Sequence, residues 1–300
     1  MASAPHVGPP QRLVRSLGAD SPWLARLPEL LAGALARWDL SAERVVAPGG
    51  RGSLVVLVRR ADGAPAALKL RADGAAAEAA ALDRWGGHGA VRLLEADPKT
   101  GALLLERLHA EVSLRSLPEA KANLEAVSSL RRLWVPPAPG GGGHPFTTVA
   151  EHTARAAERI RRHLPAEARA LADEALELCS ALLADAPEEL LLHGDFRQGA
   201  VLSAGPGRAH WLAVGPDPLV GERAYDLARL VRDRLHDLGA TSGASSLTRR
   251  RVRKLADALE VDRERLRGWS LYRAVESASR HFAAGAGADG EMLLEFAGWL

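Results

Sequence analysis

Apolar residues recur along the 300-residue chain with two different spacings. Up to about residue 107 they mostly form short runs, such as Leu54 to Val58, separated by glycine-containing turns, which is typical of strands joined by hairpins. Beyond residue 107 they mostly recur every three or four positions, which indicates amphipathic helices. The spacing therefore predicts two lobes, a small sheet-forming lobe at 1–107 and a larger helical lobe at 108–300.

The same pattern gives the expected elements. Helices are predicted at about 23–38, 74–85, 118–134, 146–164, 166–184, 247–259, 262–285 and 290–299, with one more that ends near 238. Strands are predicted at 54–58, 65–71, 91–95 and 102–106, and much later in three short apolar runs that end near 193, begin at 201 and cover 211–214. These elements predict an α+β fold, with a small mixed sheet in the first lobe and mostly helices in the second.

A lysine in one predicted strand and a glutamate in the next predicted helix form a candidate ion pair. The strand period of two places Lys69 on the face opposite Leu68 and Leu70. Glu78 falls on the apolar stripe of its helix, where an unpaired carboxylate is costly. Lys69 is the nearest cation on a facing element, so we expect the two to pair; the alternatives are a solvent-exposed lysine and a glutamate at the helix edge that reaches water.

Two further stretches of the first lobe suit nucleotide binding. The Gly-rich turn that contains Gly50, Gly52 and Ser53 lets backbone amides approach phosphate groups, although most such turns only connect strands. Glu106 ends the last predicted strand of the lobe, where a hinge would offer backbone groups to an adenine edge or serve as a plain linker. Both are binding candidates that the sequence leaves open.

Composition narrows the class of protein. A formal charge of +2 is too small to indicate a nucleic-acid partner, and the basic run at 248–255 contains Val252 and Leu255 at helical spacing, so its charges are expected on a solvated helix face. The single Cys179 excludes a disulfide framework and fits a reducing compartment. With no secretory leader in the first eleven residues and no apolar run near the ~20 residues that span a bilayer, we expect a cytoplasmic protein without membrane contact.

Residues 189–217 carry the strongest chemical pattern. A short apolar run ends in His193-Gly194-Asp195, an irregular loop follows, and two apolar runs form a hairpin that ends at Gly215-Pro216. This resembles the catalytic loop and metal-binding hairpin of protein-kinase-like phosphotransferases, in which a loop aspartate accepts the proton of the substrate hydroxyl. By that resemblance Asp195 is the catalytic base.

The resemblance extends almost end to end. Ala67-Leu68-Lys69-Leu70, the stretches 84–94, 103–108 and 218–228, and Arg-Ala-Val-Glu-Ser-Ala at 273–278 resemble the aminoglycoside/hydroxyurea antibiotic resistance kinases. The family implies a two-lobed protein-kinase-like fold, MgATP in the cleft, and a hydroxyl of a small, often cationic antibiotic as acceptor. It also implies that Lys69 contacts the ATP phosphates, that Glu78 holds Lys69, and that Asp226 buttresses the loop. Glu276 and Asp226 are candidate acids for a cationic acceptor.

The chain departs from the family inside this site. The family loop usually reads His-Gly-Asp-x-His-x-Gly-Asn and its hairpin ends in Ile-Asp-Pro, whereas here Ala200 and Gly215 replace the two metal ligands. Hard cations need oxygen ligands, so Mg²⁺ binding is doubtful. Asp217 lies on the same strand face as position 215 but ~6.6 Å further along, which makes it a weak substitute. Arg197 would partly neutralise phosphate charge without a metal, or would be a surface arginine.

Three functions remain open from the sequence. The first is a pseudokinase that has lost efficient phosphoryl transfer and still binds ATP, a small hydroxylated ligand or a protein partner. The second is an active ATP-dependent O-phosphotransferase with a metal site rebuilt around Asp217. The third is a non-enzymatic ligand- or partner-binding module, or a structural or regulatory protein whose cleft binds nothing. The retained Lys69, Glu78 and Asp195 argue against the third, and the paired loss at Ala200 and Gly215 argues against the second.

Overall fold

The computed structural model describes residues 8–300, and contacts within the chain divide it into two compact units. The first unit comprises the chain up to residue 113 together with 202–214, and the second comprises 114–201 and 215–300. The sequence division at 107/108 differs from these units because a sixth strand, β6 (His109–Ser113), pairs with β9 (Val201–Ser203). This pairing joins the hairpin at 202–214 to the first unit.

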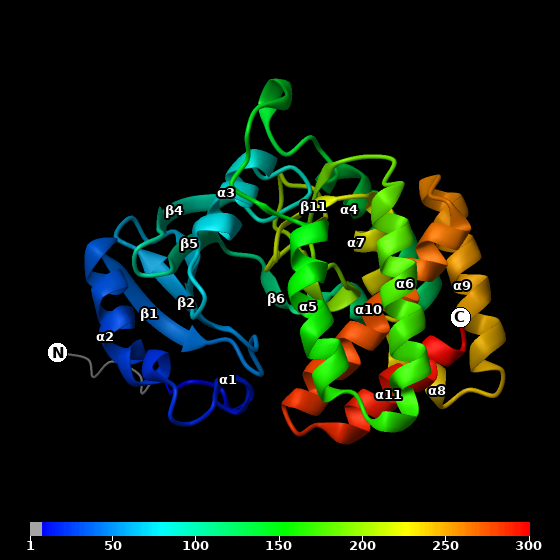
Figure 1. The fold of residues 1–300 in the computed structure, drawn as a ribbon. Helices are drawn as coiled ribbons and strands as arrows, with labels where there is room; N and C mark the ends of the chain where they lie inside the picture. Colours follow the sequence, from blue (N-terminus) through cyan, green and yellow to red (C-terminus); the bar gives the residue numbers. More distant parts are fainter. Residues whose placement is uncertain (1–7) are drawn as a thin grey trace. The chain divides into compact units, whose positions relative to one another are not determined.

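The first unit is built on a five-stranded sheet (Figure 1). Its strands, in the order β1-β2-β3-β5-β4, are β1 (Leu40–Val45), β2 (Ser53–Arg60), β3 (Pro65–Arg71), β5 (Ala102–Glu106) and β4 (Leu93–Asp97). All four neighbouring pairs are antiparallel, so the mixture of directions expected for this sheet is not found there. Short connections such as the Asp62-Gly63 turn, where Gly63 has φ +79°, explain the β2–β3 and β4–β5 pairs, because tight hairpins can join only antiparallel strands; β3 and β5 pair across the longer connection through α3 and β4.

Alternation of apolar residues along these strands creates the core of the first unit. Leu54, Val56 and Val58 on β2 and Leu68 and Leu70 on β3 are fully buried. The same cluster includes Leu13 of α1 (Gln11–Leu17) and residues of α2 (Pro22–Arg37), while α3 (Ala76–Trp85) buries Leu82 and Trp85. Helix α1 has only seven residues and was missed by the periodicity, because so short an element shows barely two turns of pattern.

The second unit is mainly helical and is arranged around α10 (Figure 1). Its α-helices are α4 (Glu119–Leu133), α5 (Val149–His163), α6 (Arg169–Ala184), α7 (Arg223–Val231), α8 (Leu235–Gly239), α9 (Ala244–Leu259), α10 (Arg263–Ala283) and α11 (Gly287–Gly298). Helix α10 packs against α5, α6, α7, α9 and α11. The predicted helices agree with these to within a few residues, except that the helix ending near 238 is divided between α7 and α8.

Short strands and single turns complete the chain. The second unit contains the sheet β7-β11-β8, formed by Thr147–Thr148, Leu219–Gly221 and Leu190–Leu192; β11 is parallel to β7 and antiparallel to β8. The first unit contains β6, β9 and β10 (Trp211–Ala213), and 3-10 turns occur at Leu114–Ser116, Pro139–Gly141, Ala166–Ala168 and Gln198–Ala200. The predicted runs near 193, 201 and 211–214 are therefore strands, and β8 delivers the chain directly to His193.

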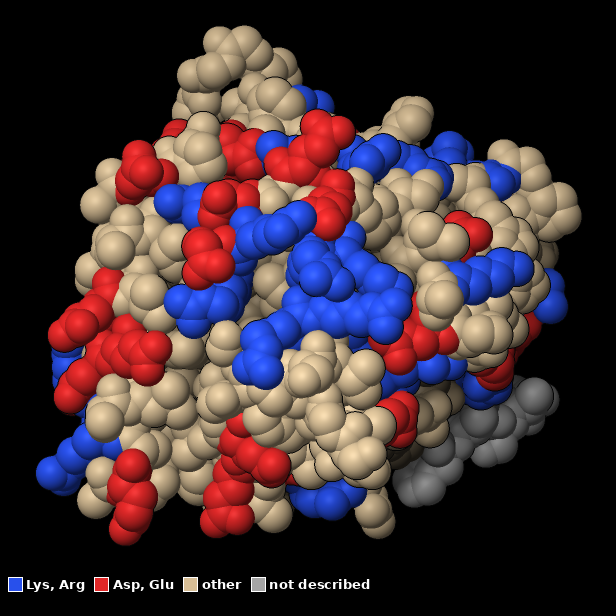
Figure 2. Space-filling view, turned by 90° about the vertical axis from the view of Figure 1, so that its right-hand side faces the viewer, with Lys and Arg blue, Asp and Glu red and all other residues tan. Residues whose placement is uncertain are grey.

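Helix α9 confirms the interpretation of the basic run. Val252 and Leu255 are buried, whereas Arg249, Arg253 and Lys254 are exposed. Figure 2 shows the side of the molecule on which α9 lies, with lysine and arginine side chains gathered near the centre of that face. Among residues 8–300, no helix combines the length and the apolar character needed to cross a membrane.

Candidate active site

A buried aspartate holds the loop that follows β8. The backbone N–H groups of His193 and Gly194 each donate to one carboxylate oxygen of Asp226, across 3.0 Å in both cases. The indole Nε1 of Trp134 donates to the same carboxylate at 3.2 Å. Asp226 lies in the first turns of α7 and is fully buried, so a carboxylate from one helix fixes the start of the loop at two successive amides. This is the buttressing arrangement expected for Asp226.

Gly194 is required by the backbone at this point. Its φ is +77°, and a Cβ atom built there would lie 1.8 Å from the carbonyl oxygen of Asp217. The backbone N–H of Asp217 donates to the carbonyl of His193 at 2.9 Å, and Nη2 of Arg273 donates to the carbonyl of Gly194 at 2.6 Å. The loop is therefore clamped between the segment after the hairpin and helix α10, and only glycine fits between them.

Asp195 is paired with two arginines. Its Oδ1 accepts from Nε of Arg229 at 3.1 Å, and its Oδ2 accepts from Nε of Arg197 at 3.2 Å. Its side chain is 42% exposed, so the carboxylate remains open to solvent. Burial by itself would raise the pKa of the Asp195 carboxyl, but the guanidinium groups of Arg229 and Arg197 outweigh burial and hold that pKa well below its ordinary range.

The second half of the loop is anchored by residues that the sequence did not single out. The backbone N–H of Gln198 donates to Asp233 at 2.5 Å, and the Gln198 side chain donates to Asn123 at 3.0 Å and accepts from Arg234 at 2.6 Å. Gln198 is almost completely buried. A glutamine in this position gave no sequence signal, because its partners lie 35 or more residues away along the chain.

The two positions of the expected metal ligands offer no oxygen-bearing side chain. Ala200 is buried, and Gly215 is an exposed residue with φ +65°, a backbone conformation that disfavours any other residue. Asp217 is exposed and two residues beyond Gly215. Within residues 8–300 no group of three or more His, Cys, Asp or Glu side chains is placed to hold a metal ion. With both oxygens of Asp195 accepting from guanidinium groups, these residues do not fit a Mg²⁺ ion.

The predicted ion pair of the first unit is formed. Nζ of Lys69 donates to both carboxylate oxygens of Glu78, at 2.8 and 2.7 Å, and Lys69 is only 7% exposed. Nη1 of Arg71 also donates to Glu78, at 2.9 Å. Arg71 was not predicted, although it lies two residues after Lys69 and therefore on the same strand face. Glu78 thus balances two cations inside the first unit.

The other nucleotide candidates of the first unit lie apart along the sheet. Gly50, Gly52 and Ser53 form the turn into β2, where the carbonyl of Gly52 accepts from the backbone N–H of Ala72 at 3.0 Å. Glu106 ends β5, and its carboxylate accepts from the backbone of Arg92 at 2.7 Å and from two nitrogens of Arg208 at 2.8 and 3.1 Å. The Glu106 side chain therefore ties the hairpin at 202–214 to the sheet.

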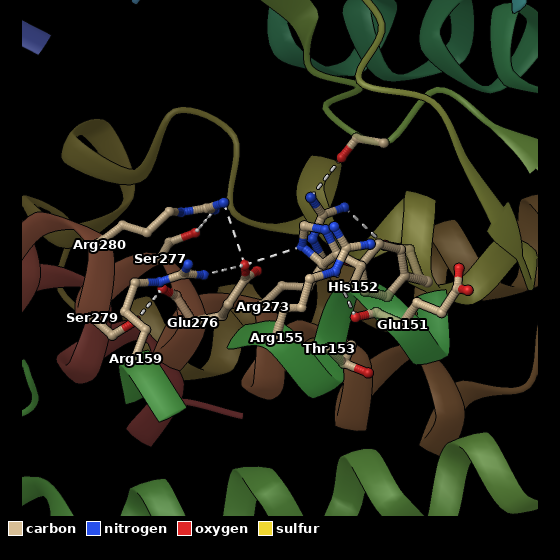
Figure 3. A network of polar contacts seen from close by, with 12 residues as sticks. Glu151, His152, Thr153, Arg155, Arg159, Arg273, Glu276, Ser277, Ser279 and Arg280 are labelled. Carbon is tan, nitrogen blue, oxygen red and sulfur yellow. Dashed lines mark hydrogen bonds and ion pairs between the residues drawn. The ribbon is translucent and has the colours of Figure 1, made fainter. Parts of the chain in front are cut away.

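Neither acid considered for a cationic acceptor is available. Figure 3 shows Glu276 at the centre of a polar network between α5 and α10. One oxygen of this fully buried carboxylate contacts Nε2 of His152 at 3.2 Å and accepts from Arg159 at 3.1 Å, with Arg280 at 3.3 Å. Burial would raise the pKa of Glu276, but Arg280 and His152 outweigh it and keep that pKa below its ordinary range. The Glu276 carboxylate is held by three neighbouring side chains, and the Asp226 carboxylate accepts from the loop amides.

Comparison with known proteins decides the family. The model of the aminoglycoside/hydroxyurea antibiotic resistance kinase family matches residues 37–285. The chain belongs to this family. It is 37% identical to streptomycin 6-kinase of Streptomyces glaucescens over 85% of this chain and 83% of that one. It is 34% identical to streptomycin 6-kinase of Streptomyces griseus over 92% of each chain, and 38% identical to hydroxyurea phosphotransferase of Kitasatospora aureofaciens over 84% of this chain and 72% of that one.

Solved structures place this resistance-kinase chain in the same fold class. Aminoglycoside phosphotransferase APH(4)-Ia has a TM-score of 0.63 at 16% identity, covering 91% of this chain and 97% of its own. A choline/ethanolamine kinase family protein from Mesorhizobium loti has a TM-score of 0.59 at 17% identity, covering 89% and 96%. The predicted two-lobed, protein-kinase-like α+β fold is confirmed.

Proposed function

We propose that this family member is a pseudokinase, a nucleotide- or small-ligand-binding protein in which Mg²⁺-dependent phosphoryl transfer is weak or lost. The observation that carries the proposal is the double ion pair of Asp195 with Arg197 and Arg229, next to a loop and a hairpin that lack both expected metal ligands. Two guanidinium groups are paired with the carboxylate that in the family would accept the proton of the acceptor hydroxyl.

The low pKa of Asp195 and the loss of the metal ligands both support weak or absent phosphoryl transfer. A general base works best when its pKa is near the working pH, and the pKa of Asp195 is held far below that. Metal charge stabilisation contributes several kcal/mol in a phosphoryl-transfer transition state, and each ~1.4 kcal/mol corresponds to tenfold in rate. Loss of the metal ligands therefore slows transfer by several orders of magnitude.

Nucleotide binding is the part of kinase function that the chain retains best. The Lys69–Glu78 pair is buried and closed, which is the arrangement that positions ATP phosphates in kinases. A solved relative of the same fold was crystallised with AMP-PNP and hygromycin B, and covers 89% of this chain with a TM-score of 0.60. We therefore propose ATP as a ligand, with a small hydroxylated compound as the second.

An active phosphotransferase is the second candidate. The curated relatives are named as kinases and match 83% and 92% of their own lengths in the two streptomycin 6-kinases. Asp217 is exposed and its backbone carbonyl lies against Gly194, so this acidic residue adjoins the loop. In this version Asp217 would bind the metal, and Asp195 would leave its arginines when substrates bind.

Thermal unfolding with ATP, with and without Mg²⁺, separates the two candidates. A ligand at 100 times its Kd stabilises a protein by about 2.7 kcal/mol, which is a shift of several degrees for a chain of this size. The pseudokinase proposal expects a shift that does not require Mg²⁺ and is lost in Lys69→Met. A shift that appears only with Mg²⁺ favours the active enzyme. No shift in either condition contradicts both and favours a binding module for another partner.

Phosphoryl transfer tests the same point directly. We expect wild-type protein to transfer phosphate from ATP to streptomycin or hydroxyurea no faster than Asp195→Ala does. The restored triple variant Arg197→His, Ala200→Asn, Gly215→Asp carries the family loop and hairpin, and a gain over wild type is the expected result. The same triple variant with Asp195→Ala is the matched control. Wild-type transfer that depends on Asp195 contradicts the pseudokinase proposal.

A further inference from the structure

Arg232 is a buried cation without a counter-ion. It follows the last residue of α7 and is 6% exposed. Nη2 donates to Oγ of Ser277 at 2.7 Å, and Nε has no hydrogen-bond partner among the described residues. Across residues 8–300 no carboxylate lies within ion-pair distance of it. A buried charge in this condition is costly unless something else neutralises it.

A second guanidinium meets the same hydroxyl. Nη2 of Arg280 donates to Ser277 Oγ at 3.0 Å, so one neutral oxygen lies within hydrogen-bond distance of two cations. Arg280 is 45% exposed at its side chain, whereas Arg232 is buried. Figure 3 shows Arg280 and Ser277 side by side on α10, with the Arg280 guanidinium beyond Glu276. Two guanidinium groups that converge on one oxygen are the geometry that recognises an oxyanion.

Four carboxylates act on the arginines around Arg232: Asp195, Glu276, Asp217 and Asp233. The two that pair directly with these arginines are already engaged. Asp195 is bound by Arg229 and Arg197, and Glu276 is contacted by Arg159, Arg280 and His152. Burial first, and then the arginines on α7 and α10, lower the pKa of Arg232, while Asp195 acts weakly in the other direction. Arg232 therefore lies among other guanidinium groups close to Asp195, without a carboxylate paired to it.

We propose that Arg232, Ser277 and Arg280 form a binding site for an oxyanion group beside the Asp195 loop. A phosphate, sulfate or carboxylate would accept from both guanidinium groups and supply the counter-ion that Arg232 lacks. The group has two possible sources, the terminal phosphate of a nucleotide and an anionic substituent of a hydroxylated acceptor. Only this choice of source rests on the proposed function; the oxyanion site itself does not.

The proposal changes the expected class of second ligand. A polycationic antibiotic would meet Arg197, Arg229, Arg232 and Arg280 in this region, where the carboxylates of Asp195 and Glu276 already have partners. Like charges repel it, whereas an anionic sugar or other hydroxylated acid is attracted. The site therefore selects against the cationic acceptors that the family resemblance implied.

Inorganic phosphate and sulfate are the probes for the first test. Thermal unfolding of the full chain is followed as each salt is added, with chloride at equal ionic strength as the reference. We expect phosphate and sulfate to raise Tm in wild type. Arg280→Gln removes the more exposed of the two guanidinium groups while His152 and Arg159 still contact Glu276, and it is expected to weaken that binding by tenfold or more. Arg253→Gln on the solvated face of α9 is the matched control and is expected to bind as wild type does.

Arg232→Met separates an anion site from a purely structural arginine. Replacing a buried, uncompensated cation with an apolar side chain of similar length is neutral or stabilising for the ligand-free protein. We therefore expect Arg232→Met to have an unchanged or higher Tm without phosphate and to lose the response to phosphate. The proposal is overturned if phosphate and sulfate leave wild-type Tm at the chloride value, or if Arg232→Met and Arg280→Gln respond as wild type does.

ATP in the same titration identifies the source of the oxyanion. If phosphate and ATP exclude each other, the site takes the terminal phosphate of the nucleotide; if their stabilising effects add, it takes the anionic group of an acceptor. Either outcome supports an oxyanion site. The phosphate probe needs neither nucleotide binding nor phosphoryl transfer. The oxyanion site can therefore be tested even if the pseudokinase proposal is wrong, and the absence of an oxyanion site would not contradict the pseudokinase proposal.

Discussion

Nε of Arg229 donates to Oδ1 of Asp195 across 3.1 Å, and this contact joins the last turn of α7 to the loop after β8. Three residues before Arg229 in the same helix, Asp226 binds the backbone amides at the start of that loop. Residues three apart lie on the same side of a helix, so α7 presents the Asp226 carboxylate to the loop backbone and the Arg229 guanidinium to the Asp195 carboxylate. One helix therefore fixes both the path of the loop and the charge of Asp195.

The first prediction concerns the carboxyl of Asp195. Arg229→Gln and Arg197→Gln each remove one guanidinium, so the pKa of Asp195 should rise in both variants toward its ordinary value. The rise should be larger in Arg229→Gln, because Arg229 lowers this pKa more than Arg197 does. Carbon-detected NMR titration of the Asp195 carboxyl measures it. Equal pKa values in wild type and Arg229→Gln would disprove the ion pair as the cause.

The second prediction concerns the anchor of the loop. Asp226→Asn keeps the shape of the side chain but turns one acceptor oxygen into a donor that faces a backbone N–H. A buried donor left without a partner costs about 1–3 kcal/mol, and loss of the charge adds to this, so we expect a loss of about 2–5 kcal/mol. Urea unfolding measures it. Asp257→Asn on the exposed face of α9 is the control and should change stability by less than about 0.5 kcal/mol.

The third prediction concerns Gly194. Gly194→Ala places a Cβ on the carbonyl oxygen of Asp217, which forces the loop or the segment at 217 to move, so we expect a loss above about 3 kcal/mol. Gly243→Ala is the matched control, because Gly243 also has a positive φ, of +86°, but no atom lies within 4 Å of its Cβ position. It should cost only the backbone strain of about 1–2 kcal/mol. Similar losses in the two variants would contradict the steric explanation.

Sequence reasoning found the parts of the site that local pattern records. Strand and helix periods place Lys69 and Glu78 on facing elements, and the apolar runs around His193-Gly194-Asp195 define a strand, a loop and a hairpin. These features depend on residues close together in the chain. The ion pair and the hairpin were therefore predicted correctly, and the family resemblance added the role of Asp226.

The residues that set the charge of the site were not predictable in this way. Arg229 lies 34 residues from Asp195 and Arg232 lies 45 from Ser277, and the chain has many arginines with no pattern that singles these out. Glu276 was considered as a pocket acid, and its burial and its contacts with His152, Arg159 and Arg280 could not be read from the sequence, because they follow from the packing of α5 against α10. Long-range packing, not local period, decides which arginine becomes a partner.

The fourth prediction gives the pH dependence of Glu276. Its pKa is lowered in the folded protein from an ordinary value of 4.5, so its ion pairs stabilise the fold above about pH 4.5 and are lost as the pH falls below it. Glu276→Gln removes the charge that balances Arg159, Arg280 and His152, and should cost about 3–5 kcal/mol at neutral pH. The difference in free energy of unfolding between wild type and variant should then decrease steadily as the pH falls below 4.5, as followed by urea unfolding.

The groups that face Glu276 supply the controls for that measurement. His152, Arg159, Arg273 and Arg280 approach it, with Tyr272 and Cys179 packed nearby. Because His152 contacts Glu276 directly, the comparison is repeated in a His152→Gln background. The narrowing below pH 4.5 should persist there. A gap that stays constant from pH 7 to pH 3 would show that the Glu276 carboxyl does not carry the effect.

The fifth prediction uses the asymmetry of the Lys69–Glu78–Arg71 cluster. In Glu78→Gln, Lys69 remains as a buried cation without a carboxylate, whereas in Lys69→Met, Glu78 still accepts from Arg71. We therefore expect Glu78→Gln to lose about 3–5 kcal/mol and Lys69→Met to lose clearly less. Urea unfolding of the two variants and of the double variant measures both costs and their coupling.

The same pair of variants separates folding from nucleotide binding. If Lys69 contacts ATP phosphates, Lys69→Met stays folded but loses the rise of Tm with ATP, while the response to inorganic phosphate at the Arg232 site is unchanged. The double variant Lys69→Met, Glu78→Gln should be more stable than Glu78→Gln alone, because it removes the uncompensated cation. A double variant that is no more stable than Glu78→Gln, or a Lys69→Met protein that ATP stabilises as strongly as wild type, contradicts these roles.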